Sequence, residues 1–125
     1  MRAQRLHAAL QETAWDRVSA RLELTRPERV TGQLPQAVRT SATLRDTLAT
    51  PGDDSLRQWQ GVNLGRFVAE EHYRLTRALA DAGLPEEARA LLAAADAILG
   101  ELRENAANGV RELAEETATR VREVS

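Results

Sequence analysis

The residues best suited to chemistry in this sequence are the adjacent Glu70, Glu71 and His72. Metal sites in helical bundles use a Glu and a His three residues apart, because this spacing places both side chains on one face of a helix. Here the glutamates precede His72 by one and two residues, so the three side chains point in different directions around a helix. The cluster therefore predicts neither a metal site nor a cofactor.

His72 has a structural interpretation as well. It falls on an apolar stripe formed by Val68, Leu75 and Leu79 at helical spacing. A hydrogen-bonded histidine in the core or at its boundary explains this position better than a ligand does. A bundle enzyme or metal site near His72, with Glu71 and Tyr73, stays open as a third alternative for the function.

Other catalytic patterns are missing from the sequence. Gly61 and Gly65 lack the Lys-Ser/Thr pair that a phosphate-binding loop requires, and no nucleophile elbow occurs. There is no cysteine, which excludes thiol catalysis, disulfides and Cys-type zinc sites. We therefore expect a protein that is not an enzyme.

Basic residues near the N-terminus suggest a second alternative, a helical regulator or accessory factor that contacts nucleic acid. Residues 1–50 carry a net charge of +3 and residues 51–125 one of −5, for a total of −2. Acidic residues interleave with the arginines of the first helix, so a solvated helix face is the better interpretation and nucleic acid an unexpected partner. The arginines are Arg2, Arg5, Arg17 and Arg21, and the acids Glu12, Asp16 and Glu23.

Composition predicts a helical protein. The 125 residues suit one domain, and a core with few aromatics must rely on Leu, Val and Ala, as close-packed helices do. All 17 basic residues are arginine, a bias typical of bacteria with GC-rich genomes. We see neither a membrane-spanning segment nor a signal peptide, and expect a cytoplasmic protein.

The clearest local signal is a helical hairpin. Gly83 and Pro85 stand between two apolar stripes, as glycine after one helix and proline at the start of the next. Residues 72–95 resemble one tetratricopeptide-type helix pair, and the resemblance implies a helical hairpin without assigning a function. Its packing and turn residues are Leu75, Leu79, Gly83, Glu87, Ala88, Leu92 and Ala95. We see no second copy of this unit.

Three further helices are expected before the hairpin's second arm. The first covers residues 2–24, with a strand over 18–24 as the alternative because apolar residues alternate there. Residues 25–34 are expected to form a turn, since Thr25 and Glu28 match a capping box. A weak second helix follows over 35–49, then a loop over 50–55. The third helix extends to Ala82, either continuous through Gly61 and Gly65 or restarted near Asn63.

The stripe continues from Pro85 through a possible kink or end at residues 105–109 to Val121, and predicts an over-long fourth helix. Helices one to three are too short to cover it, and exposed stripes of this length usually mark an interface. We therefore expect a homodimer, with residues 105–125 as an extended or frayed tail if it does not form. The expected interface residues are Leu92, Leu99, Leu102, Val110, Leu113 and Val121.

Together these observations predict an all-α, single-domain protein over residues 1–125. The expected architecture is an antiparallel helical bundle of about four helices with a long, coiled-coil-like C-terminal helix. The expected function is a small helical interaction or scaffold protein that self-associates through that helix, with no membrane partner.

Overall fold

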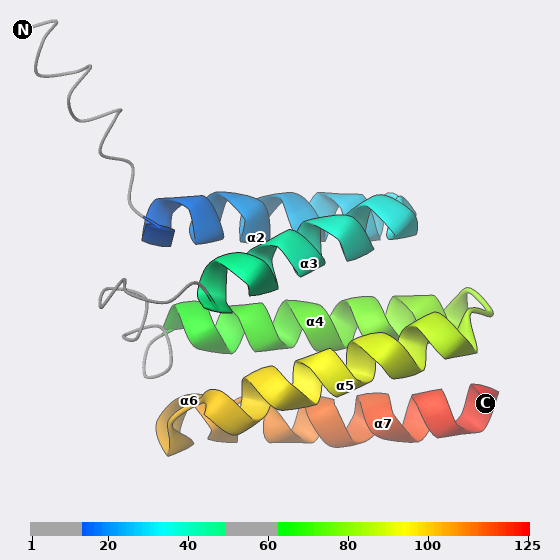
Figure 1. The fold of residues 1–125 in the computed structure, drawn as a ribbon. Helices are drawn as coiled ribbons and strands as arrows, with labels where there is room; N and C mark the ends of the chain where they lie inside the picture. The colour runs from blue at the N-terminus through cyan, green and yellow to red at the C-terminus, as the bar shows by residue number, and fades with distance from the viewer. Residues whose placement is uncertain (1–13, 50–62) are drawn as a thin grey trace, which may run out of the picture.

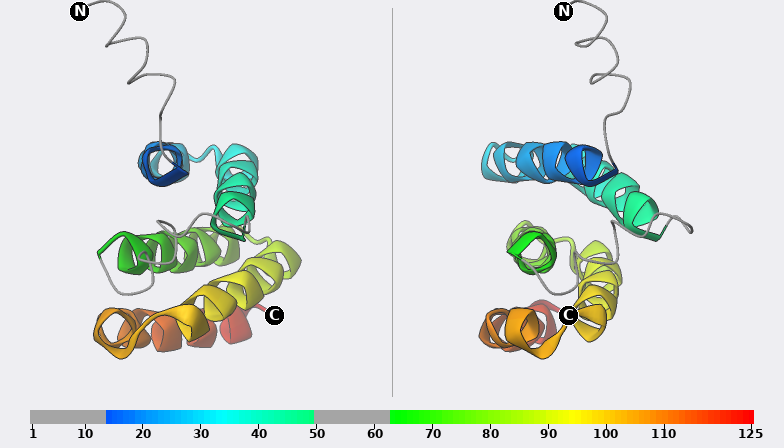
Figure 2. Two further views of the ribbon diagram at one scale, coloured as in Figure 1. Left: turned by 60° about the vertical axis from the view of Figure 1, so that its left-hand side comes forward. Right: turned by 90° about the vertical axis from the view of Figure 1, so that its left-hand side faces the viewer.

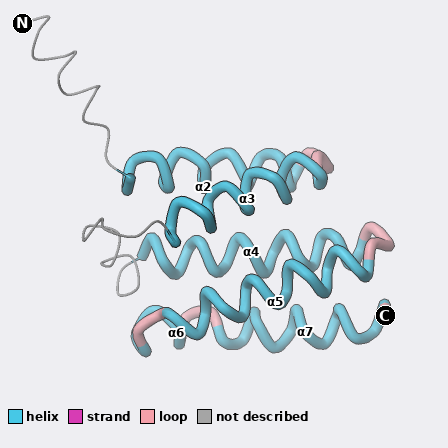
Figure 3. The backbone as a smooth tube through the Cα atoms, in the orientation of Figure 1, coloured by secondary structure: helices cyan, strands magenta, loops and turns pink. Residues whose placement is uncertain are grey.

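The computed structural model describes residues 14–49 and 63–125, and every element in these two ranges is a helix (Figures 1 and 3). The prediction of an all-α protein is therefore confirmed for this part of the chain, although six helices are present where about four were expected. They are α2 (Ala14–Val30), α3 (Leu34–Ala49), α4 (Asn63–Asp81), α5 (Pro85–Glu101), α6 (Glu104–Asn108) and α7 (Arg111–Val124).

The helices are arranged around α4. Two hairpins, α2–α3 and α4–α5, follow one another, and α7 completes the opposite side of the molecule (Figures 1 and 2). Helices α2, α4 and α7 run in one direction, whereas α3 and α5 run in the other (Figure 1). Helix α4 contacts every other described helix. Its residues consequently supply much of the core.

The two hairpins share one turn. Gly32 and Gly83 have φ values of 81° and 79°, a left-handed conformation that glycine adopts without the penalty of a Cβ atom. The main-chain hydrogen bonds also correspond: Gln33 N donates to Glu28 O at 2.8 Å, and Leu84 N donates to Leu79 O at 3.0 Å. This is the helix-ending pattern in which a left-handed residue allows the last carbonyls to be bonded.

The first hairpin was not recognised as a counterpart of the second from sequence. In the second hairpin Leu84 and Pro85 directly follow Gly83, whereas one residue separates Gly32 from Leu34 and Pro35. The Leu-Pro pair is thus displaced by one position relative to the shared glycine. The expectation of a single helical hairpin was therefore incomplete.

The turn expected over residues 25–34 begins later than predicted. Thr25 lies inside α2, where its hydroxyl donates to the Arg21 carbonyl at 3.0 Å instead of capping a helix start. Pro27 also lies within α2. The helix therefore extends to Val30, and the alternative of a strand over 18–24 is wrong. The helix expected over 35–49 is confirmed as α3.

The third and fourth expected helices both differ from the prediction. The third is described only from Asn63, as α4, so Gly61 and the loop over 50–55 lie outside the described residues, as do residues 2–13 of the first helix. The fourth is wrong as a continuous helix. Leu102 and Arg103 are extended, with ψ values of 145° and 155°, and the chain reverses direction between α5 and α7.

The reversal covers the stripe that was expected to be exposed. Leu102 and Val110 are buried in a cluster with Tyr73 and Ile98, and Val121 is buried beside α4 in a second cluster. The other three predicted interface residues, Leu92, Leu99 and Leu113, are partly buried against the same clusters. The premise of the predicted interface is therefore wrong, because α7 folds back onto α4 and buries this apolar surface within one chain.

Within the two described ranges, no helix is both long and apolar enough to cross a lipid bilayer.

Candidate functional site: a cleft between α2 and α4

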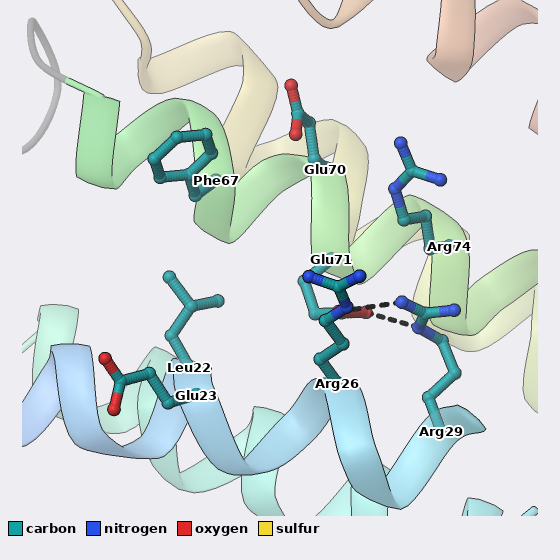
Figure 4. A pocket seen from close by; sticks show the side chains of 8 residues that line it. All are labelled: Leu22, Glu23, Arg26, Arg29, Phe67, Glu70, Glu71 and Arg74. Atoms are coloured by element: carbon teal, nitrogen blue, oxygen red, sulfur yellow. Dashed lines mark hydrogen bonds and ion pairs between the residues drawn. The ribbon is translucent and has the colours of Figure 1, made fainter. Parts of the chain in front are cut away.

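A cleft of about 630 Å³ lies between α2 and α4 (Figure 4). Its walls come from one face of each helix. On α2, Leu22, Arg26 and Arg29 are spaced four and three residues apart, which places them on one side. The same spacing on α4 brings Phe67, Glu71 and Arg74 to the opposite wall, and the remaining lining residues are Glu23 and Glu70.

One ion pair joins the two walls. Arg29 Nε lies 2.6 Å from Glu71 Oε2, and Arg29 Nη2 donates to Glu71 Oε1 at 3.1 Å. A guanidinium and a carboxylate paired through two hydrogen bonds form a specific and rigid contact. The Glu71 side chain retains only 9% of its exposure. The pair therefore fixes the position of α2 against α4 and neutralises both charges.

Two other arginines of the cleft remain available. Arg26 and Arg74 are exposed, and within the described part of the chain neither side chain forms an ion pair. Glu70 lies 3.6 Å from Arg66. The cleft thus holds two cationic groups that can accept a partner from outside.

The other end of the cleft is apolar. Leu22 points from α2 toward α4, on the side where Phe67 lies (Figure 4). Phe67 remains 43% exposed, which is unusual for a phenylalanine in a protein with few aromatic residues. The Arg66 guanidinium lies 5.0 Å from the centre of its ring, a cation–π contact that holds the ring at the surface.

His72 belongs to the core and not to the cleft. Its Nδ1 lies 2.8 Å from the Val68 carbonyl, which can only accept, so Nδ1 carries the proton. Its Nε2 lies 3.0 Å from Arg45 Nη1, which can only donate. Burial, together with the Arg45 charge and against the Val68 hydrogen bond, lowers the pKa of His72 to about 4. His72 is therefore a neutral core residue that links α4 to α3.

The neighbouring Tyr73 is also committed to the interior. Its hydroxyl donates to Asp96 Oδ1 at 2.5 Å, and burial followed by this contact raises the pKa of Tyr73 above its ordinary value. Glu70, Glu71 and His72 point to three different partners, in agreement with their spacing. Within residues 14–49 and 63–125, no three His, Asp or Glu side chains gather closely enough to hold a metal ion.

A second groove, of about 540 Å³, lies between α3 and α5. Its surface is mostly apolar and includes Leu48, Ala94 and Ile98. The guanidinium at this groove, Arg45, already donates to His72 in the core. The cleft between α2 and α4 is therefore the better candidate for a binding site.

Sequence reasoning missed this cleft, and none of the six predicted interface residues lines it. The useful signal was the recurrence of Leu22, Arg26 and Arg29 at helical spacing. It was hidden because residues 25–34 were interpreted as a turn, which separated Arg29 from the helix that carries Leu22.

Comparisons of the chain with protein-family models, curated proteins and solved structures found no match.

Proposed function

We propose that this chain is a non-enzymatic helical interaction protein that holds a segment of a partner polypeptide in the cleft between α2 and α4. The observation that carries the proposal is the combination in one cleft of an exposed Phe67 with Arg26 and Arg74, which lack ion-pair partners in the described chain. Aromatic residues and arginine are the side chains enriched at the energetic centres of protein interfaces.

The shape of the cleft suits a polypeptide. It follows two helices that lie side by side and offers apolar and charged groups in turn along its length. Its volume lies within the usual range of about 300–1,000 Å³ for ligand sites. A chain segment with mixed side chains matches such a surface, because its apolar groups and charges meet separate parts of the wall.

The positions of the titratable groups favour binding over catalysis. The groups suited to proton transfer, His72 and Tyr73, are hydrogen-bonded in the core and do not line the cleft. A general acid or base must reach its substrate within hydrogen-bond distance. The bundle-enzyme alternative therefore receives no support from this site.

The charge of the cleft favours a polypeptide over nucleic acid. Its three arginines are balanced by Glu23, Glu70 and Glu71. Binding of a phosphate backbone requires a surplus of positive charge over an extended surface. The accessory-factor alternative would have to use some other surface.

Self-association stays a proposal of lower rank. The residues expected to form the homodimer lie in the core or against it, so a second copy would have to insert a segment into the cleft like any other partner. The experiment described next therefore counts a second copy as one identity of the partner.

Site-directed photo-cross-linking tests the proposal. The photoreactive residue p-benzoylphenylalanine replaces Glu23 in the cleft or, as a control, the exposed Arg89 on α5. In cells that naturally express the protein, we expect an adduct of defined mass from the cleft position alone. An adduct of twice the chain mass would identify the partner as a second copy.

The substitution Phe67→Glu provides the matched control, because it removes the apolar end of the cleft at an exposed site. We expect it to abolish the adduct while the circular dichroism spectrum stays unchanged. Equal cross-linking from Glu23 and Arg89, or an adduct that survives Phe67→Glu, would contradict the proposal.

A further inference from the structure

We infer that the segment held between α2 and α4 carries a single carboxylate close to a large apolar side chain. This inference rests on the proposed function and names the chemistry of the partner. It follows from how the charges of the cleft are used, from the distance between its two ends, and from the acidic residues that remain in it.

The first step concerns the arginines. Glu71 binds Arg29 through two hydrogen bonds and neutralises it. Arg26 precedes Arg29 by three residues on α2, and Arg74 follows Glu71 by three residues on α4 (Figure 4). The wall around the ion pair therefore keeps two guanidinium groups, one from each helix. Guanidinium groups bind carboxylates with matching geometry.

The second step concerns distance along the cleft. Arg26 lies four residues beyond Leu22 on α2, and Arg74 lies seven residues beyond Phe67 on α4. At the helical rise, these separations correspond to about 6 and 10 Å. An extended chain covers this distance in about two to three residues. The apolar side chain and the acid of the partner are therefore about two to three residues apart.

The third step concerns the charge of the ligand. Glu23 and Glu70 line the same cleft as the two available arginines. A phosphate group, with a charge close to −2, would meet stronger repulsion from these carboxylates than a carboxylate would. The cleft consequently favours an Asp, a Glu or a chain-terminal carboxylate over a phosphorylated residue.

Selection from a displayed library of random linear peptides tests the inference. On the full wild-type chain, we expect recovered peptides to be enriched in an acid about two to three residues from Leu, Phe or Trp. On the double variant Arg26→Gln, Arg74→Gln, the acidic preference should vanish. A selected peptide should bind that variant about tenfold more weakly by fluorescence anisotropy.

Two controls separate binding from folding. Arg77→Gln changes an exposed arginine on α4 that does not line the cleft, and it should leave the affinity unchanged. Glu70→Gln removes a negative charge from the cleft and should tighten binding of the acidic peptide about twofold. A gain in affinity cannot arise from a partly unfolded variant.

The outcomes distinguish this inference from the proposed function. Peptides that need Phe67 but show no acidic preference, or that bind more tightly with phosphoserine in place of the acid, would overturn the inference and leave the interaction module intact. Failure to recover any peptide that depends on Phe67 would overturn both.

Discussion

The hairpins α2–α3 and α4–α5 are built with the same turn but are buried to different extents. In α4, Val68, Tyr73 and Leu75 are wholly buried, and side chains on most of the helix surface contact other helices. In α2, between residues 19 and 30, only Thr25 is buried, while Leu24 and Val30 are 56% and 68% exposed. Equivalent local structure thus occurs in two very different environments.

The difference shows what attaches the first hairpin to the rest of the molecule. Helix α3 contributes Ala37 and Leu44 to the core, but α2 is joined to α4 mainly through the ion pair of Arg29 and Glu71. An interface held by polar groups packs less closely than an apolar one. The cleft that we propose as a binding site lies where this closer packing is missing.

The largest expected effect contrasts two leucines at the extremes of burial. Leu75→Ala in α4 should lower the free energy of unfolding by about 4 kcal/mol, because it opens a cavity in the core. Leu24→Ala in α2 should change it by less than about 0.5 kcal/mol, because that side chain is more than half exposed. Urea denaturation measures both values. Similar losses for the two variants would contradict the difference in burial between the hairpins.

A second prediction concerns His72, which connects the two hairpins through Arg45. Its pKa is lowered from 6.5 to about 4, so between these pH values the unfolded chain binds a proton that the folded chain does not. Stability contributed by neutral His72 is complete above pH 6.5 and falls as the pH is lowered through this window, by up to about 3 kcal/mol.

The measurement for His72 is urea denaturation at a series of pH values, compared with the variant His72→Gln. The variant should be less stable at neutral pH but should lose less stability between pH 6.5 and 4. Parallel pH profiles for the two proteins would show that His72 titrates alike in the folded and unfolded chains, against the geometry of its two hydrogen bonds.

A third prediction concerns the contact between α2 and α4. Glu71→Gln should destabilise the protein by about 2 kcal/mol, because it leaves Arg29 partly buried without its carboxylate. Hydrogen exchange should accelerate in α2 more than in α5, since α2 depends on this link. Glu70→Gln is the matched control: its weaker contact with Arg66 is more exposed, and stability should change little. Equal exchange in both helices would argue against a separately opening α2.

The sequence supported predictions that depend on local signals. Gly83 and Pro85 correctly placed the α4–α5 hairpin, and the spacing around His72 correctly predicted a core position. The weak helical pattern over residues 35–49 also proved to be a helix. Each of these features is determined by neighbours within a few residues, by turn geometry or by helical periodicity.

The wrong predictions involve competition between local and distant contacts. A capping box at Thr25 and Glu28 matches the sequence rule, but the hydroxyl bonds back within a continuing helix. The stripe from Pro85 to Val121 has helical spacing throughout, yet the chain leaves the helix at Leu102 and Arg103 because the reversal buries that apolar surface against α4. The cleft depends on the same tertiary arrangement, so its two walls could not be paired from the sequence.

The smallest expected effect tests the feature that the hairpins share. Gly32→Ala and Gly83→Ala should each destabilise the protein by about 1 kcal/mol, because alanine in the left-handed conformation brings Cβ close to the carbonyl oxygen. No atom lies within 4 Å of an added Cβ at either site, so packing makes no difference between them. Equal losses in urea denaturation would show that the turn is stabilised locally, independently of how deeply each hairpin is buried. A clearly smaller loss for Gly32→Ala would instead indicate that the first hairpin relaxes its turn, as its fewer contacts with the core would allow.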